Sequence, residues 1–218
     1  MSGGANLEEL IFPRNEEQAV PMAKYMKNHF PFAGVPKPER ARLQKKFLVQ
    51  SKQLEVTEVL SLAKKYYQKA EREYQYVAIE LIQLNVRRLA FSDLVMLLSL
   101  VQEKEWWDSI DSWRKVYTTW CKAHPDQLEQ VFNLFIQQED FWLRRIAITL
   151  QLGLKEKVNQ SLLKKAILQD RETTEFFIQK GIGWALRDYS KTNPGWVKDL
   201  LEQEALSKLA EREASKYL

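Results

Sequence analysis

Three stretches of the sequence share one pattern: EWWDSIDSW begins at Glu105, DFWLRRIAI at Asp140 and EFFIQKGIGW at Glu175. Each begins with an acid, continues with aromatic residues and then takes on the apolar spacing of an amphipathic helix. The starts lie 35 residues apart, and a weaker copy, EYQYVAIEL, begins 32 residues earlier, at Glu73. A repeat of this length, filled by two helices, is typical of an α-solenoid of the HEAT type. The sequence therefore predicts an all-α superhelix.

The rest of the chain is compatible with such a repeat. Few β-branched runs and almost no hairpin signals are present, so no strand is predicted. Helix breaks are marked by PFAGVPKP at 31–38, HPD at 124–126 and TNPG at 192–195. We expect about a dozen helices of roughly ten to eighteen residues in a single domain over residues 1–218. Stacked repeats of this kind bury a continuous core and leave one concave surface.

Composition sets limits on function without choosing one. The chain has 218 residues with 45% hydrophobic and 11% aromatic content, which is typical of a globular protein. Its net charge of +4 balances 33 basic against 29 acidic residues. A charge this small does not separate a nucleic-acid binder from other proteins, so the arrangement of the charges has to decide.

The single cysteine, Cys121, excludes an internal disulfide and favours a reducing, cytoplasmic location. A thiol nucleophile is conceivable there, but a small residue in a helix interface is the simpler interpretation. The N-terminus lacks the pattern of a signal peptide, and no window is apolar enough to span a membrane. The two histidines, His29 and His124, lie far apart, so neither a metal site nor a cofactor is expected.

Adjacent tryptophans open the first of the three strong copies. Neighbouring helical residues point about 100° apart, so Trp106 and Trp107 cannot share one face. One of them is expected in the core. Asp111, four residues after Trp107, lies on the face of Trp107.

The repeat also offers a comparison between its own copies. In a register that aligns the three acids, Asp111 stands where the other copies carry Ile146 and Gly181. One interpretation is that the acid forms an intramolecular pair with a nearby arginine. The other is a catalytic carboxylate between aromatic walls.

Basic residues gather on the same helices. Arg144 and Arg145 follow Asp140, while Lys180 and Arg187 follow Glu175. Trp184, three residues before Arg187, lies on nearly the same helix face as that arginine. One wall could thus combine Trp107, Asp111, Arg145, Trp184 and Arg187 from three repeats, and spaced arginines suit phosphates.

Several other features are assigned to packing. Ser207–Leu218 is predicted to be an ordinary amphipathic terminal helix. The remaining tryptophans of these repeats are predicted to pack in the core or between repeats: Trp106, Trp113, Trp120 and Trp142. The sequence contains neither of the glycine motifs that bind phosphates, G-x-x-x-x-G-K-[ST] and G-x-G-x-x-G, and no Ser/His/Asp set is found. Nucleotide hydrolysis, hydride transfer and triad hydrolysis are therefore disfavoured.

A resemblance to the AlkD-type DNA glycosylases is carried by three stretches, WWDSID, FWLRR and FFIQKGIGWALRDYSKTNP. It extends to PMAKYMKNHFPFAGVPKPER and covers Pro21 to Tyr189. These alkylpurine repair enzymes are built from HEAT-like repeats and hydrolyse the glycosidic bond of N3- and N7-alkylated purines, which are cationic. The resemblance implies a base excision repair enzyme that needs no cofactor, binds double-stranded DNA containing alkylated purines and is expected to be a monomer.

The resemblance also implies roles for individual residues. Asp111 would stabilise the oxocarbenium-like sugar and position water, and Trp107 and Trp184 would hold that sugar between their faces. Arg145 and Arg187 would bind phosphates beside the lesion. Further DNA-binding candidates are Arg144, Lys180 and Tyr25, the last within YMKNHF.

The N-terminal region departs from the family pattern. Because IFPRN contains Pro13, the first full helix of the family is expected to be reduced or broken here. Pro36 stands where a polar side chain able to reach DNA is expected. One alternative function is therefore a catalytically weak or silent paralogue that binds nucleic acid or protein through its concave face. Another is a solenoid that binds protein alone, which predicts a concave surface without net positive potential.

Overall fold

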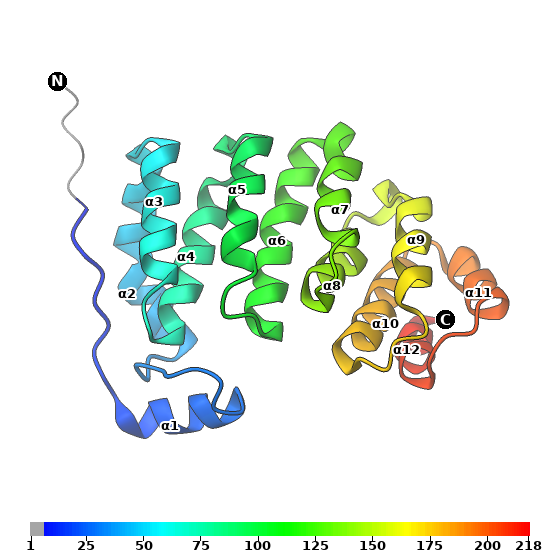
Figure 1. Ribbon diagram of the computed structural model, residues 1–218, viewed down its shortest axis with the longest axis horizontal. Coiled ribbons are helices and arrows are strands. Elements are labelled where there is room, and N and C mark those ends of the chain that lie inside the picture. The colour runs from blue at the N-terminus through cyan, green and yellow to red at the C-terminus, as the bar shows by residue number, and fades with distance from the viewer. Residues whose placement is uncertain (1–6) are drawn as a thin grey trace. The chain divides into compact units, whose positions relative to one another are not determined.

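The computed structural model describes residues 7–218, which are mainly helical (Figure 1). Residues 7–218 contain twelve α-helices and five short 3₁₀ helices, with no strand, so the predicted all-α class is confirmed. The α-helices are α1 (Glu16–Tyr25), α2 (Lys37–Gln50), α3 (Val56–Tyr67), α4 (Arg72–Asn85), α5 (Phe91–Val101), α6 (Trp107–Ala123), α7 (Leu128–Ile136), α8 (Phe141–Thr149), α9 (Gln160–Asp170), α10 (Phe176–Ser190), α11 (Pro194–Gln203) and α12 (Lys208–Ala214). The 3₁₀ helices span Ser51–Gln53, Val86–Arg88, Pro125–Gln127, Lys155–Lys157 and Ser215–Tyr217.

The helices group into two compact units, Met1–Leu100 and Val101–Leu218. Helices α1 to α4 and nearly all of α5 belong to the first unit, and α6 to α12 belong to the second. The single domain over 1–218 and its concave surface stay predictions.

The repeat is visible in the helix starts. Helices α4, α6, α8 and α10 begin at residues 72, 107, 141 and 176, so that successive starts are 35, 34 and 35 residues apart. Two of the acids that open the sequence pattern cap their helices. The Asp140 side chain accepts a hydrogen bond from Trp142 N–H, and that of Glu175 accepts one from Phe177 N–H. These caps explain why an acid recurs at the repeat start, because it satisfies a backbone donor that the helix leaves unpaired.

Helix α6 departs from this pattern, and its departure corrects the predicted register. Its N-cap is Trp106 instead of the preceding acid, so α6 begins one residue later than the aligned acids imply. Counted from the helix starts, the fifth residues of α6, α8 and α10 are Asp111, Arg145 and Lys180. The prediction that Asp111 corresponds to Ile146 and Gly181 was therefore wrong, and the equivalent position is charged in all three helices.

In the first unit, residues 7–15 run without helix beside α3 and α4. Leu10 and Phe12 are buried, and their backbone N–H groups donate to the hydroxyls of Tyr66 and Tyr74 at 2.8 and 3.1 Å. Within the described residues, helical structure begins only at Glu16, and the reduction of the family's first helix stays a prediction. Pro36 immediately precedes α2.

The loop before α2 is held by a buried carboxylate. Glu73 of α4 accepts hydrogen bonds from the backbone N–H groups of Ala33, Gly34 and Val35, at 3.0, 2.9 and 3.0 Å. Gly34 has a φ of +90°, and a Cβ there would lie 2.0 Å from the Asn15 carbonyl oxygen. Only glycine fits this approach. Glu73 therefore has a structural role, and the predicted helix break at 31–38 is confirmed.

In the second unit, α10 packs against α8 and α12 (Figure 1). Its apolar face is fully buried, with Ile178 and Ile182 at 0% exposure. Gly183 permits α12 to lie close, because a Cβ at this position would meet the Glu213 Cβ at 2.5 Å and the Ala210 carbonyl oxygen at 2.9 Å. Side chains of α12 are thereby brought to the surface of α10.

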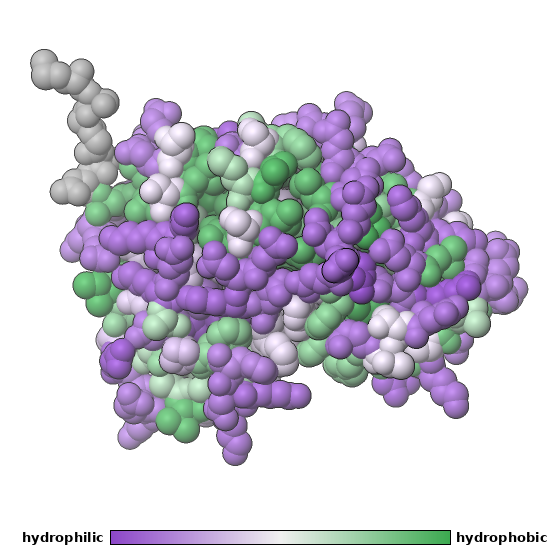
Figure 2. Space-filling model, in the orientation of Figure 1, coloured by the Kyte–Doolittle hydropathy of each residue, from purple (hydrophilic) through white to green (hydrophobic). Residues whose placement is uncertain are grey.

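Hydrophilic residues cover much of the face seen in Figure 2, with hydrophobic residues scattered among them. Within residues 7–218, no helix combines the length and the apolar character that crossing a bilayer requires.

Candidate functional site

The two adjacent tryptophans at the start of α6 take different positions, as predicted, although Trp106 is the N-cap of the helix and only Trp107 belongs to it. Both are partly buried, so Trp106 packs between repeats and not in the core. The Trp106 ring packs against the rings of Trp142 and Phe177, with centroid distances of 5.7 and 5.5 Å. Trp107 lines a cavity together with Asp111, one helical turn further on. The aromatic cluster around Trp106 anchors the helix starts and leaves Trp107 to form a wall.

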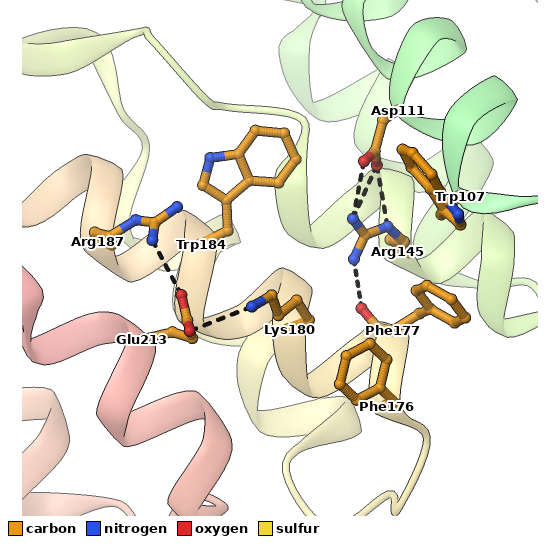
Figure 3. A pocket seen from close by; sticks show the side chains of 9 residues that line it. All are labelled: Trp107, Asp111, Arg145, Phe176, Phe177, Lys180, Trp184, Arg187 and Glu213. Carbon is orange, nitrogen blue, oxygen red and sulfur yellow. Dashed lines mark hydrogen bonds and ion pairs between the residues drawn. The ribbon is translucent and has the colours of Figure 1, made fainter. Parts of the chain in front are cut away.

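The cavity encloses about 270 Å³ among α6, α8, α10 and α12 of the second unit. Figure 3 shows that side chains from these four helices converge on it. Its lining residues are Trp107, Asp111, Arg145, Phe176, Phe177, Lys180, Trp184, Arg187 and Glu213. All five side chains that the sequence places on one wall are among them. The cavity therefore combines two tryptophans, two carboxylates and three cations.

Asp111 and Arg145 form a two-pronged ion pair in this cavity (Figure 3). Arg145 Nε donates to Asp111 Oδ1 and Nη2 donates to Oδ2, both at 3.0 Å, and Nη1 donates to the Phe177 carbonyl oxygen. The Arg145 side chain is 4% exposed, whereas that of Asp111 is 23% exposed. The intramolecular pair and the carboxylate between aromatic walls, which the sequence offered as alternatives, occur together.

This ion pair determines which hydrogen-bond donors and acceptors of Asp111 and Arg145 remain available to a ligand. An ionised carboxylate has about four lone-pair sites, and Arg145 occupies one on each oxygen. The partly exposed Asp111 therefore keeps acceptor capacity toward the cavity. The buried Arg145, by contrast, directs three of its donors into the protein. Its geometry suits holding Asp111 better than the predicted binding of a phosphate.

An arginine of α6 lies behind the opposite wall. Arg114, three residues after Asp111, is 6% exposed, and its guanidinium carbon lies 5.4 Å from the centroid of the Trp184 ring. Burial lowers the pKa of this guanidinium, while the charge of Asp111 opposes that effect. The sequence analysis missed Arg114, although its i,i+3 spacing from Asp111 was a usable signal.

The cations of α10 converge on one carboxylate of α12. Lys180 Nζ lies 3.2 Å from Glu213 Oε1, and Arg187 Nη1 lies 3.0 Å from Glu213 Oε2 (Figure 3). Lys216 adds a third contact at 2.8 Å. The hydrogen bond from Lys216, followed by that from Lys180, holds the pKa of the Glu213 carboxyl at about 2 despite its burial. The terminal segment predicted as an ordinary amphipathic helix thus contributes to the cavity, which the sequence analysis missed.

Arg144, predicted to bind DNA, has a different environment from its neighbour Arg145. Its Nε donates to both carboxylate oxygens of Asp170, at 2.9 and 3.1 Å, and its Nη1 donates to the carbonyl oxygens of Gln138 and Glu139. It does not line the cavity. These contacts join α8 to the end of α9 and to the loop after α7, which favours a structural role for Arg144. Its contribution to DNA binding stays a prediction.

Tyr25, the remaining predicted DNA-binding residue, is the last residue of α1 in the first unit and is 71% exposed. Its contribution to DNA binding stays a prediction.

Glu105 and Asp140 form a pair of carboxyl groups at the starts of α6 and α8. Burial, followed by a hydrogen bond with Asp140, raises the pKa of the Glu105 carboxyl to about 8. Asp140 is itself held as the N-cap of α8. Glu105 therefore carries a proton at neutral pH, and its role in the pattern differs from that of the capping acids of α8 and α10.

Other chemistry receives little support from the described residues. Burial raises the pKa of the Cys121 thiol to about 12, which is far from that of a nucleophilic thiolate. Across residues 7–218, no group of three or more His, Cys, Asp or Glu side chains is placed to hold a metal ion.

The chain is similar to known proteins over most of its length. A family model described as "DNA alkylation repair enzyme" matches residues 7–218. A solved structure from Enterococcus faecalis, described as a "Predicted DNA alkylation repair enzyme", is 52% identical, with a TM-score of 0.95 over 96% of this chain and 99% of that chain. No curated protein matches the chain.

Two more distant structures resemble the fold. AlkD2 from Streptococcus mutans is 22% identical with a TM-score of 0.63, covering 84% of this chain and 98% of its own. The protein smu.31 from Streptococcus mutans UA159 is 23% identical with a TM-score of 0.61, covering 82% and 97% of the two chains. The predicted class of HEAT-like helical repeats is confirmed by these likenesses.

Proposed function

The chain belongs to the family of DNA alkylation repair enzymes, and on that premise we propose that it is a DNA glycosylase that hydrolyses the N-glycosidic bond of cationic alkylated purines, N3-methyladenine and N7-methylguanine, in duplex DNA. The observation that carries the proposal is the carboxylate of Asp111, which Arg145 holds by two hydrogen bonds and which is partly exposed in a cavity walled by Trp107 and Trp184.

Hydrolysis of this glycosidic bond does not require a strong general acid from the protein. An N3- or N7-alkylated purine carries a positive charge, so it leaves as a neutral base without being protonated. What the enzyme must supply is stabilisation of an oxocarbenium-like sugar and delivery of water to it. A fixed carboxylate serves both needs, because its charge opposes the developing cation and its free lone pairs accept a proton from water.

Arg145 supports this role through geometry. Two hydrogen bonds to one carboxylate fix the side-chain orientation of Asp111 before substrate arrives, so no reorganisation is required during the reaction. Arg145 is a positioning residue in this mechanism. It acts through Asp111 in place of binding a phosphate.

The aromatic walls and the remaining cations complete the site. The indole faces of Trp107 and Trp184 favour a neighbouring positive charge, since the face of an aromatic ring is electronegative. Lys180 and Arg187 line the same cavity and have donors left after their contacts with Glu213, so they are the groups that bind phosphates beside the lesion.

We also propose that the protein acts as a monomer in the cytoplasm as part of base excision repair, without a cofactor. The reducing compartment is supported by the single cysteine, which is buried.

A duplex oligonucleotide carrying one N7-methylguanine tests the proposal. The protein should release the free alkylated base and leave an abasic site that alkali cleaves, while an undamaged duplex of the same sequence stays intact. Release should need no added metal and should slow as salt weakens DNA binding. A folded protein that binds the duplex but releases no base from it, or from a duplex carrying N3-methyladenine, would instead be the silent paralogue.

A further inference from the structure

The cation pair of the cavity depends on a residue from outside the three strong repeats. Lys180 and Arg187 stand seven residues apart on α10, two helical turns, with Trp184 between them. Both turn toward the same carboxylate, Glu213 of α12 (Figure 3). A single anion therefore brings these two cations together.

Glu213 is a fixed anchor for these cations. Its side chain is 6% exposed, and Lys180 and Arg187 are 44% and 27% exposed. The backbone beneath it is equally constrained, since Gly183 lets α12 approach α10 so closely that a single added Cβ would clash. The neighbouring Ala210 and Ala214 of α12 are fully buried. The carboxylate is thus held in place, and both cations line the cavity.

We propose that Glu213 is a positioning residue that holds Lys180 and Arg187 as a preformed clamp for a phosphate group beside the sugar-binding walls. This inference rests on the proposed function for the identity of the ligand, a phosphodiester of the lesion strand. Side chains of lysine and arginine lose much conformational freedom on binding, and a clamp ordered in advance lessens that cost.

A competing role for the same contacts predicts the opposite effect. If the carboxylate merely occupied the place of the phosphate, removing its charge would free both cations and tighten binding to any DNA. If Glu213 positions them, removing its charge disperses the pair. Binding that depends on the clamp then weakens, although the local charge becomes more positive.

The test compares two duplexes of equal length, one containing a tetrahydrofuran abasic-site analogue and one undamaged. The measured quantity is the ratio of their affinities for the wild type and for Glu213→Gln. We expect the ratio to fall about tenfold, because one or more charge-assisted hydrogen bonds to the phosphate no longer form, while affinity for the undamaged duplex does not fall. The salt dependence for the analogue should also become shallower, by about one unit of slope for each phosphate that the variant no longer binds.

Two further variants separate positioning from folding. Lys216, the third partner of Glu213, does not line the cavity. Lys216→Gln should therefore leave the ratio of affinities unchanged. Glu213→Asp keeps the charge but withdraws it by one methylene, so it should retain the fold and lower the ratio by less than Glu213→Gln. A general loss of folded protein would lower both affinities equally and leave the ratio as it was.

Inorganic pyrophosphate provides a readout independent of DNA repair. Titration followed by the indole N–H signal of Trp184 should show saturable binding to the wild type and to Lys216→Gln, and about tenfold weaker binding to Glu213→Gln. If this holds in a protein that releases no alkylated base, the clamp stands and the glycosylase proposal fails. A protein that releases the base but shows an unchanged ratio and unchanged pyrophosphate binding in Glu213→Gln overturns the clamp alone.

Discussion

Arg145 of α8 holds Asp111 of α6 by two parallel hydrogen bonds of 3.0 Å each, and the arginine is the more deeply buried partner. The adjacent Arg144 makes a similar pair with Asp170 outside the cavity. One helix thus carries a proposed functional ion pair and a structural one on consecutive residues. This arrangement provides each functional variant with a matched structural control.

Asp111→Asn should cost stability as well as activity. Removing the charge leaves Arg145 buried without its anion, and breaking a buried pair in this way costs about 3–5 kcal/mol. Asp170→Asn should cost a similar amount, since it deprives Arg144 of its anion. Chemical denaturation of both variants measures these costs. A stability loss confined to Asp170→Asn would show that Arg145 does not depend on Asp111.

Arg145→Lys should lower the rate of base release with little effect on binding to undamaged DNA, because a lysine cannot reproduce the two parallel hydrogen bonds. Arg144→Lys should lower only stability. Single-turnover kinetics and binding assays distinguish the two. Should Arg145→Lys instead weaken binding to all DNA and make its salt dependence shallower, Arg145 would be a phosphate-binding residue.

Trp184→Phe should slow base release by roughly threefold to thirtyfold, the range expected for a weakened interaction between an aromatic face and a cation. Trp107→Phe should act similarly. The control is Trp196→Phe in α11, whose ring packs on Tyr189 at 5.4 Å and does not line the cavity. Equal effects from all three substitutions would remove the aromatic walls from the mechanism.

The proton on Glu105 makes stability depend on pH. The pKa of this carboxyl is raised from 4.5 to about 8, so between these values the unfolded chain ionises while the folded protein keeps the proton. The contribution of the protonated Glu105 carboxyl to the free energy of unfolding is complete below pH 4.5, and it is lost as pH rises through about 8. Glu105→Gln should flatten this part of the profile. At pH 8 it should raise the melting temperature by about 2–4 °C for each kcal/mol recovered. If the melting temperatures of wild type and variant changed in the same way from pH 5 to pH 9, the raised pKa of Glu105 would be contradicted.

Cys121 should be inert in the folded protein. Its thiol is buried and its pKa lies near 12, so a thiol reagent at pH 7.5 should react with it only after unfolding. Base release should survive prolonged treatment with the reagent. Rapid modification of the native protein together with loss of activity would contradict this prediction and support Cys121 as a thiol nucleophile.

Much of the fold could be predicted from the sequence because its repeat is a local pattern. Aromatic residues, an acid and helical spacing recur at about 35 residues, and these features mark helix starts regardless of distant contacts. The prediction that Trp106 and Trp107 point in different directions holds, although Trp106 has the extended backbone of an N-cap and is not a helical residue. The register failed by one residue at α6, because the sequence does not reveal that Trp106 takes the N-cap position held by Asp140 and Glu175 in α8 and α10.

The candidate site was predictable where it follows the repeat and missed where it depends on long-range packing. Asp111, Arg145 and Lys180 stand at equivalent positions of three helices, so the pattern brings them together. Glu213 lies 26 residues from Arg187 and reaches the cavity only because α12 docks at Gly183. The different surroundings of Arg144 and Arg145 could not be predicted, because two consecutive arginines look alike until the position of Asp170 is known.

Release of N7-methylguanine from a duplex under single-turnover conditions, compared for the wild type, Asp111→Asn and Asp170→Asn, tests the central claim most directly. The positioned carboxylate predicts that Asp111→Asn lowers the rate about 10²–10⁴-fold. Asp170→Asn, assayed at a temperature where it is folded, should keep nearly the wild-type rate. Equal rates for the two variants, or a wild type that releases no base, would contradict the assignment of Asp111 as the catalytic carboxylate.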